Sequence, residues 1–418
     1  MKKVLEHINW IAFLVLLAAM PYPWQFIRFF WIVWLATWLL ELRFLKHPQI
    51  ELKRLTPFIG MIIWLLWNCI SIIWTPDKLL AKNIIGTQIN VLFMLPIALW
   101  GVNKNYDIKK CMKIIIVSSC IAIVVYLFAH YWVMNFEHAQ DRTLPAVYHI
   151  DFVHLDTLLL DIKHRMHFTN FLCMAVLSVL FMAADWKIKF GRLWGYMLSF
   201  VILLWLSLGI FWTGSRLGMI NLFIVVALFF IVRLKGRKRV IGITASVAAV
   251  AAVVALLFAF HPRFKAVYPP YMNYYIHEDS VKPTPEPRMA IWKIVFLNKD
   301  QYPIYGMGLG SSEQFLAKEY HKYELTQFEQ RRYSAHNEFL TLWMELGSIA
   351  AVLMFLFWVF LPLCYQSGRS RQLAVGFTAV ALTAMLTDHI LSGLEGIVFV
   401  SVFMFLPLIN ESSDDEKN

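Results

Sequence analysis

The sequence predicts an all-α polytopic membrane protein with about twelve transmembrane helices, each of which needs about 20 mostly apolar residues. Of the 418 residues, 59% are hydrophobic and only 16% are charged, whereas soluble domains carry about 25% charged residues. The mean hydropathy is +0.60, and long apolar stretches recur along the whole chain. These observations exclude a soluble globular enzyme.

Each expected span is an apolar stretch bounded by polar or turn-forming residues. The first stretch follows two lysines, as in a secretory signal, but a second stretch comes only a few residues later. We therefore expect the first stretch to be retained as a membrane anchor. In chain order the expected spans are residues 8–22, 27–43, 57–74, 88–102, 111–132, 167–184, 195–213, 217–232, 240–260, 339–364, 373–388 and 395–410.

Lysine and arginine are concentrated in alternate short loops, and loops of this kind face the cytoplasm. Both termini are therefore expected in the cytoplasm, and the formal net charge of +11 reflects topology rather than nucleic-acid binding. The opposite side carries Arg28, Lys78 and Lys82 in short turns. The basic loops contain Lys2, Lys3, Arg43, Lys46, Lys53, Arg54, Lys104, Lys109, Lys110, Lys113, Lys187, Lys189, Arg192, Arg233, Lys235, Arg237, Lys238, Arg239, Arg369 and Arg371.

Four regions follow from this topology. Residues 1–260 are expected to form transmembrane helices 1–9, with an extracytoplasmic loop at about 133–166. A large extracytoplasmic loop, 261–335, separates helices 9 and 10. Residues 336–410 are expected to form helices 10–12, and residues 411–418 a cytoplasmic tail.

The large loop is expected to be partly helical. Repeated prolines at 283–287 forbid a helix through that stretch. The pattern then predicts a short amphipathic helix over 288–297 and a polar helix over 311–323. The apolar face of the first of these helices would consist of Ile291, Trp292, Val295 and Phe296.

The first motif with functional potential is Thr213-Gly214-Ser215-Arg216, between the seventh and eighth spans. An arginine within a spanning helix costs roughly 2.5 to 3.5 kcal/mol on insertion scales. Arg216 therefore either snorkels to the interface or faces an anion in a wet cavity. The small and hydroxyl-bearing neighbours favour the cavity, because they let a ligand approach and supply donors.

The second motif is Pro287-Arg288, at the expected start of the amphipathic helix. A helix N-terminus carries partial positive charge and free backbone N–H groups. A guanidinium at that position would strengthen an anion-binding surface. The alternative is an ordinary solvated arginine.

The third motif is His336-Asn337-Glu338, directly before the tenth span. Histidine exchanges a proton near neutral pH and suits a general base at the membrane surface. Asn337 and Glu338 are candidates for orienting the imidazole or a sugar hydroxyl. The alternative is an interfacial histidine that is only packed and hydrogen-bonded.

Further candidates for substrate contact lie at the same side of the membrane. Arg165 and His167 precede the sixth span and either contact substrate phosphates or form a plain interfacial flank. Asp388 closes the eleventh span, where it is either a functional carboxylate or a partner that holds an arginine in place. The five cysteines have no disulfide or zinc spacing, so we expect neither a disulfide framework nor a metal site.

The three motifs, in this order and on this topology, resemble the O-antigen ligase family of bacterial membrane glycosyltransferases. The resemblance is carried by the Thr-x-Ser-Arg-Leu-Gly segment at Arg216, the Arg-x-x-x-Trp segment at Arg288 with the glycine run 306–310 after it, and the His-Asn-Glu segment at His336. The large loop before the tenth span and the length also fit. The resemblance implies a GT-C-like fold in the bacterial inner membrane, with a periplasmic active site.

The resemblance also implies a reaction in lipopolysaccharide biosynthesis. The family transfers a glycan from undecaprenyl diphosphate to a sugar hydroxyl of lipid A-core, inverting the anomeric configuration without metal or nucleotide. Carried over, Arg216 and Arg288 would hold the donor diphosphate and His336 would deprotonate the acceptor hydroxyl. Ser215 is a further candidate, which would either contact the substrate or support Arg216.

Two alternatives stay open. An O-antigen polymerase would use the same donor with a lipid-linked glycan as acceptor, and motifs do not encode that choice. A lipid-glycan transporter would also have about twelve spans, but the chain shows no internal repeat and its polar motifs gather at one face. The glycine run 306–310 lacks the P-loop lysine and lies outside the cytoplasm, so ATP is not an expected ligand.

Overall fold

A computed structural model describes residues 2–42, 52–90, 105–136, 165–232, 234–260, 287–354 and 368–409. These residues form helices and turns, and they contain no strand. The proline-rich stretch 261–286 and most of the expected outer loop at 133–166 lie outside the described residues, as does the tail 411–418. The all-α expectation is confirmed for the part of the chain that the structure describes.

Helices coincide with every expected span except 88–102, most of which falls outside the described residues. Their bounds are α1 (Lys2–Ala19), α2 (Trp24–Leu42), α3 (Leu52–Ser71), α6 (Ile108–Phe136), α8 (Arg165–Phe190), α9 (Arg192–Trp212), α10 (Arg216–Ile231), α11 (Gly236–Phe260), α17 (Glu338–Met354), α19 (Gly368–Thr387) and α20 (Leu394–Phe405).

Three of the described helices are long and apolar enough to cross a membrane: Ile108–Ala129, Met166–Phe190 and Arg192–Trp212. Shorter apolar helices occupy Phe58–Ser71, Arg216–Ile231 and Leu394–Met404. These helices support a membrane protein, while the layout of twelve spans stays a prediction.

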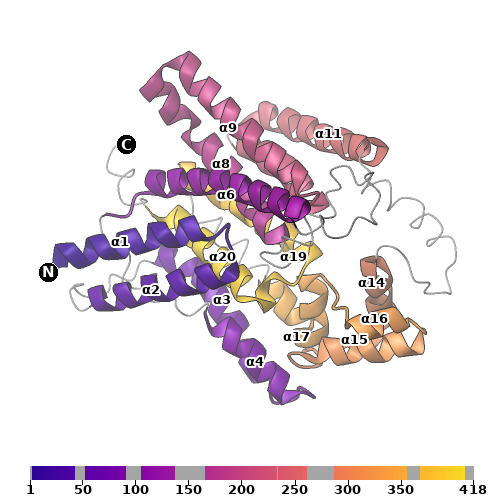
Figure 1. Ribbon diagram of the computed structural model, residues 1–418. Coiled ribbons are helices and arrows are strands. Elements are labelled where there is room, and N and C mark those ends of the chain that lie inside the picture. The colour runs from indigo at the N-terminus through magenta and orange to yellow at the C-terminus, as the bar shows by residue number, and fades with distance from the viewer. Residues whose placement is uncertain are drawn as a thin grey trace.

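Helix α8 lies at the centre of the bundle, in contact with α6, α9, α10 and α19 (Figure 1). Its residues from Phe168 to Met182 are buried on every side of the helix. A helix that is apolar all round is typical of such a central position. The helices that carry the candidate site residues are therefore arranged around α8.

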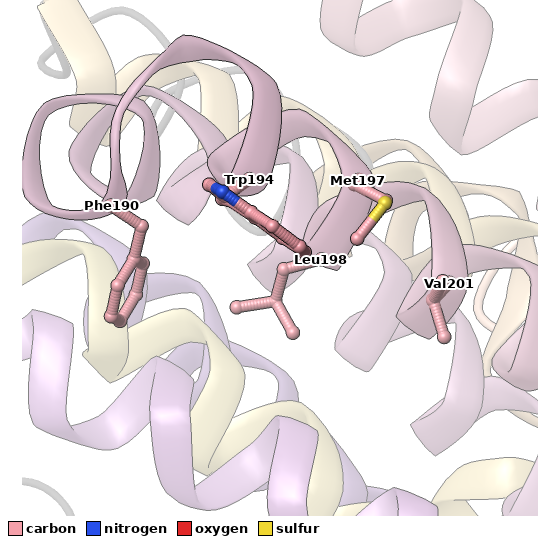
Figure 2. A pocket seen from close by; sticks show the side chains of 5 residues that line it. All are labelled: Phe190, Trp194, Met197, Leu198 and Val201. Carbon is pink, nitrogen blue, oxygen red and sulfur yellow. The ribbon is translucent and has the colours of Figure 1, made fainter.

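Helix α9 has the opposite environment, because much of its apolar surface is exposed. An apolar groove of about 520 Å³ lies at the junction of α8 and α9, and Figure 2 shows the side chains that line it. An exposed apolar face of this extent matches a helix that contacts lipid. The groove is lined by Phe190, Trp194, Met197, Leu198 and Val201.

A second hydrophobic core lies outside this bundle, where α14 (Pro287–Leu297), α15 (Ser311–Lys322) and α16 (Thr326–Arg331) pack beside α17 (Figure 1). The helices predicted over 288–297 and 311–323 are confirmed. The predicted face of the first helix was partly wrong, because Phe296 is 52% exposed whereas Ile294 is fully buried. Helix α14 packs into this second core through Ala290, Ile291, Ile294 and Val295.

The expected turn after the third span was also wrong, since Lys78 and Lys82 belong to helix α4 (Lys78–Gln88). Asp77 caps this helix, and its Oδ1 accepts hydrogen bonds from the backbone N–H groups of Leu79 and Leu80 at 3.1 and 2.9 Å. An aspartate at this position satisfies N–H groups that a helix start leaves unpaired. The cap explains why a helix begins here.

Candidate functional site

His336 and Asp388 contact each other, although 52 residues separate them in the sequence. The Nδ1 atom of His336 lies 3.3 Å from Oδ1 of Asp388, and both side chains are partly buried. His336 has a left-handed backbone with φ of 45°, a conformation that costs energy for a residue with a side chain. When Nδ1 donates its proton to Asp388, Nε2 carries the lone pair that a general base needs.

Asn337 and Glu338 fix the start of α17 against the segment that carries Asp388. The Asn337 amide donates to the Leu386 carbonyl at 3.0 Å, while its oxygen accepts from the Leu340 N–H at 3.1 Å. Glu338 accepts from the Leu391 N–H at 3.1 Å. Both side chains bind backbone on either side of Asp388. They therefore hold the carboxylate opposite His336.

Burial has a chemical consequence for Glu338, which precedes the expected tenth span. Desolvation raises the pKa of this carboxyl from 4.5 to about 8, and the negative charges of Glu345 and Asp388 act in the same direction. The group is therefore mostly protonated at neutral pH. It can donate one hydrogen bond as well as accept one.

Arg288 lies near the start of α14, in its first turn. Trp292 is one turn further along the helix, and its indole N–H donates to the Ala335 carbonyl at 2.8 Å. Residues four apart in a helix share a face. The contact therefore ties the face of α14 that bears Arg288 to the residue before His336.

Arg216 begins α10, and Ser215 caps that helix by accepting from the Gly218 N–H at 3.1 Å. Thr169 of α8 donates to Ser215 at 3.4 Å. A Cβ on Gly218 would come within 2.8 Å of the Cβ of Thr169, so only glycine permits this approach of α10 to α8. The Thr-x-Ser-Arg-Leu-Gly segment thus fixes the position of Arg216 at the start of α8.

The first turn of α8 also contacts the end of α19. Thr387, next to Asp388, lies 3.5 Å from the sulfur of Met166. The start of α10, the start of α8 and the end of α19 therefore meet at one end of the bundle. His167 lies beside Glu395 at 3.9 Å at this same end, whereas the side chain of Arg165 falls outside the part of the chain that the structure describes.

The glycine run docks onto a break in α17. Gly347 has φ of 81°, which interrupts the helix and leaves carbonyls free to accept other donors. The N–H groups of Met307 and Gly308 donate to the Met344 and Glu345 carbonyls at 2.9 and 2.8 Å. A Cβ on Gly306 would come within 2.3 Å of the Glu345 carbonyl oxygen. The run thus joins the outer layer to α17.

A polar cavity of about 370 Å³ adjoins Asp388 and Glu338. Its other wall, formed by Asn68 of α3 and by α4 with Gln88, was not predicted from the sequence. Asn68 could have been noticed, because an asparagine within the apolar span 57–74 is costly in lipid and is often functional. Gln88 carries no such signal, because it stands at the boundary of an expected span.

Residues 200–355 match the family model described as O-Antigen ligase, and this supports an O-antigen ligase family assignment. The matched segment contains Arg216, Arg288 and His336, whereas Asp388 lies beyond it. No curated protein matches the chain.

Proposed function

We propose that this chain, assigned to the O-antigen ligase family, is a glycosyltransferase of lipopolysaccharide biosynthesis. It transfers a polysaccharide from undecaprenyl diphosphate to a sugar hydroxyl of lipid A-core, at the periplasmic face of the bacterial inner membrane. The family match supports the reaction class. The contact between His336 and Asp388 is the observation that supports the chemistry most directly.

His336 acts as the general base. The acceptor hydroxyl oxygen attacks the anomeric carbon from the face opposite the diphosphate, so the configuration is inverted. The bond between that carbon and the phosphate oxygen breaks, and its electron pair leaves with undecaprenyl diphosphate. The hydroxyl proton passes to Nε2 of His336, and the resulting imidazolium is stabilised by Asp388 at 3.3 Å.

Arg216 and Arg288 bind the diphosphate. Each lies in the first turn of a helix, α10 or α14, where backbone N–H groups also favour an anion. A guanidinium stays protonated and offers a planar fork of donors to phosphate oxygens. Two such groups stabilise the charge of the leaving diphosphate, so the proposed transfer needs no metal ion.

The test is a transfer assay with purified protein in detergent and EDTA, with undecaprenyl-diphosphate glycan as donor and lipid A-core as the other acceptor. Glycan on lipid A-core is the expected product. Longer lipid-linked glycan with unmodified core would instead identify a polymerase. No product from either acceptor would contradict a transferase and favour the transporter.

A further inference from the structure

The polar cavity of about 370 Å³ is built from the faces of two helices. Residues of α4 enter it at intervals of four, and residues of α17 enter it at intervals of three and four, so each set lies on one side of its helix. The start of α15, the segment after α19, Asn68 of α3, and Arg332 and Ser334 after α16 complete the walls. The two helix faces consist of Leu80, Ile84 and Gln88 on α4, and Glu338, Thr341, Leu342 and Glu345 on α17.

Two amide oxygens in the wall make no hydrogen bond within the described residues. They are Oδ1 of Asn68 and Oε1 of Gln88, on side chains that are 0% and 4% exposed. The orientation of Asn68 is set by its Nδ2, which donates to the Trp64 carbonyl at 2.7 Å. A buried acceptor without a donor is unfavourable. Both oxygens therefore favour a ligand that brings N–H or O–H groups.

The remaining polar groups of the wall include four carboxyl groups, the guanidinium of Arg332 and several hydroxyls. Glu313, Glu345 and Asp388 contribute carboxylates, and Glu345 already accepts from the Ser312 hydroxyl, whereas Glu338 is mostly protonated at neutral pH. Three carboxylates outweigh one guanidinium, so the wall disfavours a phosphate-bearing ligand, because carboxylates and anions repel one another. A sugar ring has several hydroxyl donors and no charge. Its apolar C–H face would contact leucine and isoleucine side chains of the same wall, Leu80, Ile84, Leu309 and Leu342.

Asp388 belongs to both the cavity and the candidate base, because its carboxylate lines the cavity and contacts His336 at 3.3 Å. We infer that this cavity binds an uncharged sugar ring of the acceptor glycan, with Asn68 and Gln88 accepting hydrogen bonds from its hydroxyls. The inference rests on the proposed function. Both residues lie outside the segment 200–355 that matches the family model, so the acceptor would be selected by residues outside the matched segment.

The experiment measures the binding of the acceptor separately from the KM for the donor. The probe is core oligosaccharide freed of its lipid and its phosphates, titrated calorimetrically into purified protein without donor. Gln88→Met removes one acceptor oxygen at similar volume and should weaken binding by about 3- to 10-fold, as expected for one neutral hydrogen bond. Asn68→Leu tests the same cavity from a different helix. In the transfer assay, the KM for lipid A-core should rise in both variants while the KM for the donor stays unchanged.

Asn83→Leu is the matched control, because Asn83 lies on the exposed side of α4. It should bind the oligosaccharide as the wild type does. Unchanged binding in both cavity variants, or equal weakening in Asn83→Leu, would overturn the subsite. Wild-type protein that binds the oligosaccharide but transfers no glycan would contradict the proposed function and leave the subsite standing.

Discussion

The helix starts at Arg216 and Arg288 and the cavity beside Asp388 differ in the charge that they favour. The two helix starts present guanidinium and backbone N–H donors, which suit an anion. The cavity presents several carboxyl and amide oxygens beside one guanidinium, that of Arg332, and this excess of acceptors suits an uncharged ligand with many O–H donors. His336 contacts the carboxylate at the edge of the cavity. We therefore propose separate regions for the diphosphate and the acceptor sugar, with His336 beside the second.

The largest effect is expected at His336, the proposed general base. His336→Ala should lower turnover by about 10²- to 10⁴-fold, the usual contribution of a general base. Binding of the donor should change little, because the diphosphate is assigned to the arginines. Single-turnover rates and donor binding by the same preparation check this. Near-normal turnover would show that His336 is not the base.

Removing a guanidinium should weaken the proposed binding of the donor diphosphate. Arg288→Ala should reduce kcat/KM for the donor by about 10- to 100-fold, since a hydrogen bond to a charged group is worth about 1.5 to 3 kcal/mol. Arg216→Ala should have an effect of the same kind. The control is Arg371→Ala, because Arg371 is exposed near the start of α19, at the opposite end of this helix from Asp388. An effect confined to the acceptor KM would contradict the assignment.

The link between the two regions is tested by Asp388→Asn. The amide keeps the size of the side chain but loses the charge that stabilises the imidazolium. Turnover should fall by about tenfold or more, while donor binding stays constant. Steady-state kinetics with saturating donor would show this as a change in kcat. A purely structural role predicts instead a parallel loss of thermal stability.

The smallest effect is expected at Glu338. Its pKa is raised to about 8, so the folded protein binds a proton that the unfolded chain releases above its ordinary pKa of 4.5. Stability should therefore fall as the pH rises from about 4.5 to about 8. Glu338→Gln is neutral at every pH and should flatten this part of the profile. Thermal unfolding in detergent at about pH 6 and about pH 9 measures the difference.

Local patterns predicted most of the helices but not the contacts between them. Apolar runs located the helices of the bundle, and the proline before Arg288 located α14, because both signals act within a few residues. The face of α14 was harder to predict. Which face of α14 is buried depends on where α15 and α16 pack. Ile294 is therefore buried and Phe296 is exposed, although both are apolar.

In the candidate site too, the sequence located the residues but not the contacts between them. Arg216 was found as a charge beside an apolar span, Arg288 as a charge at a helix start and His336 as a titratable group before a span, and the family match covers all three. The partner of His336 was not predicted, because Asp388 follows the end of α19, 52 residues further along the chain. Asn68 and Gln88 enter the cavity through packing of α3 and α4 against α17 and the glycine run, for example through the hydrogen bond from Trp67 to the Leu346 carbonyl at 3.0 Å. No local pattern encodes such a contact.

The central claim is that the diphosphate and the acceptor sugar bind in separate regions. The most direct test measures the KM for the donor and the KM for the acceptor in two variants, with the same transfer assay. Arg288→Ala should raise the KM for the undecaprenyl-diphosphate donor and leave the KM for lipid A-core unchanged. Gln88→Met should do the reverse. If both variants altered the KM of the same substrate, the separation of diphosphate and acceptor sugar would be wrong.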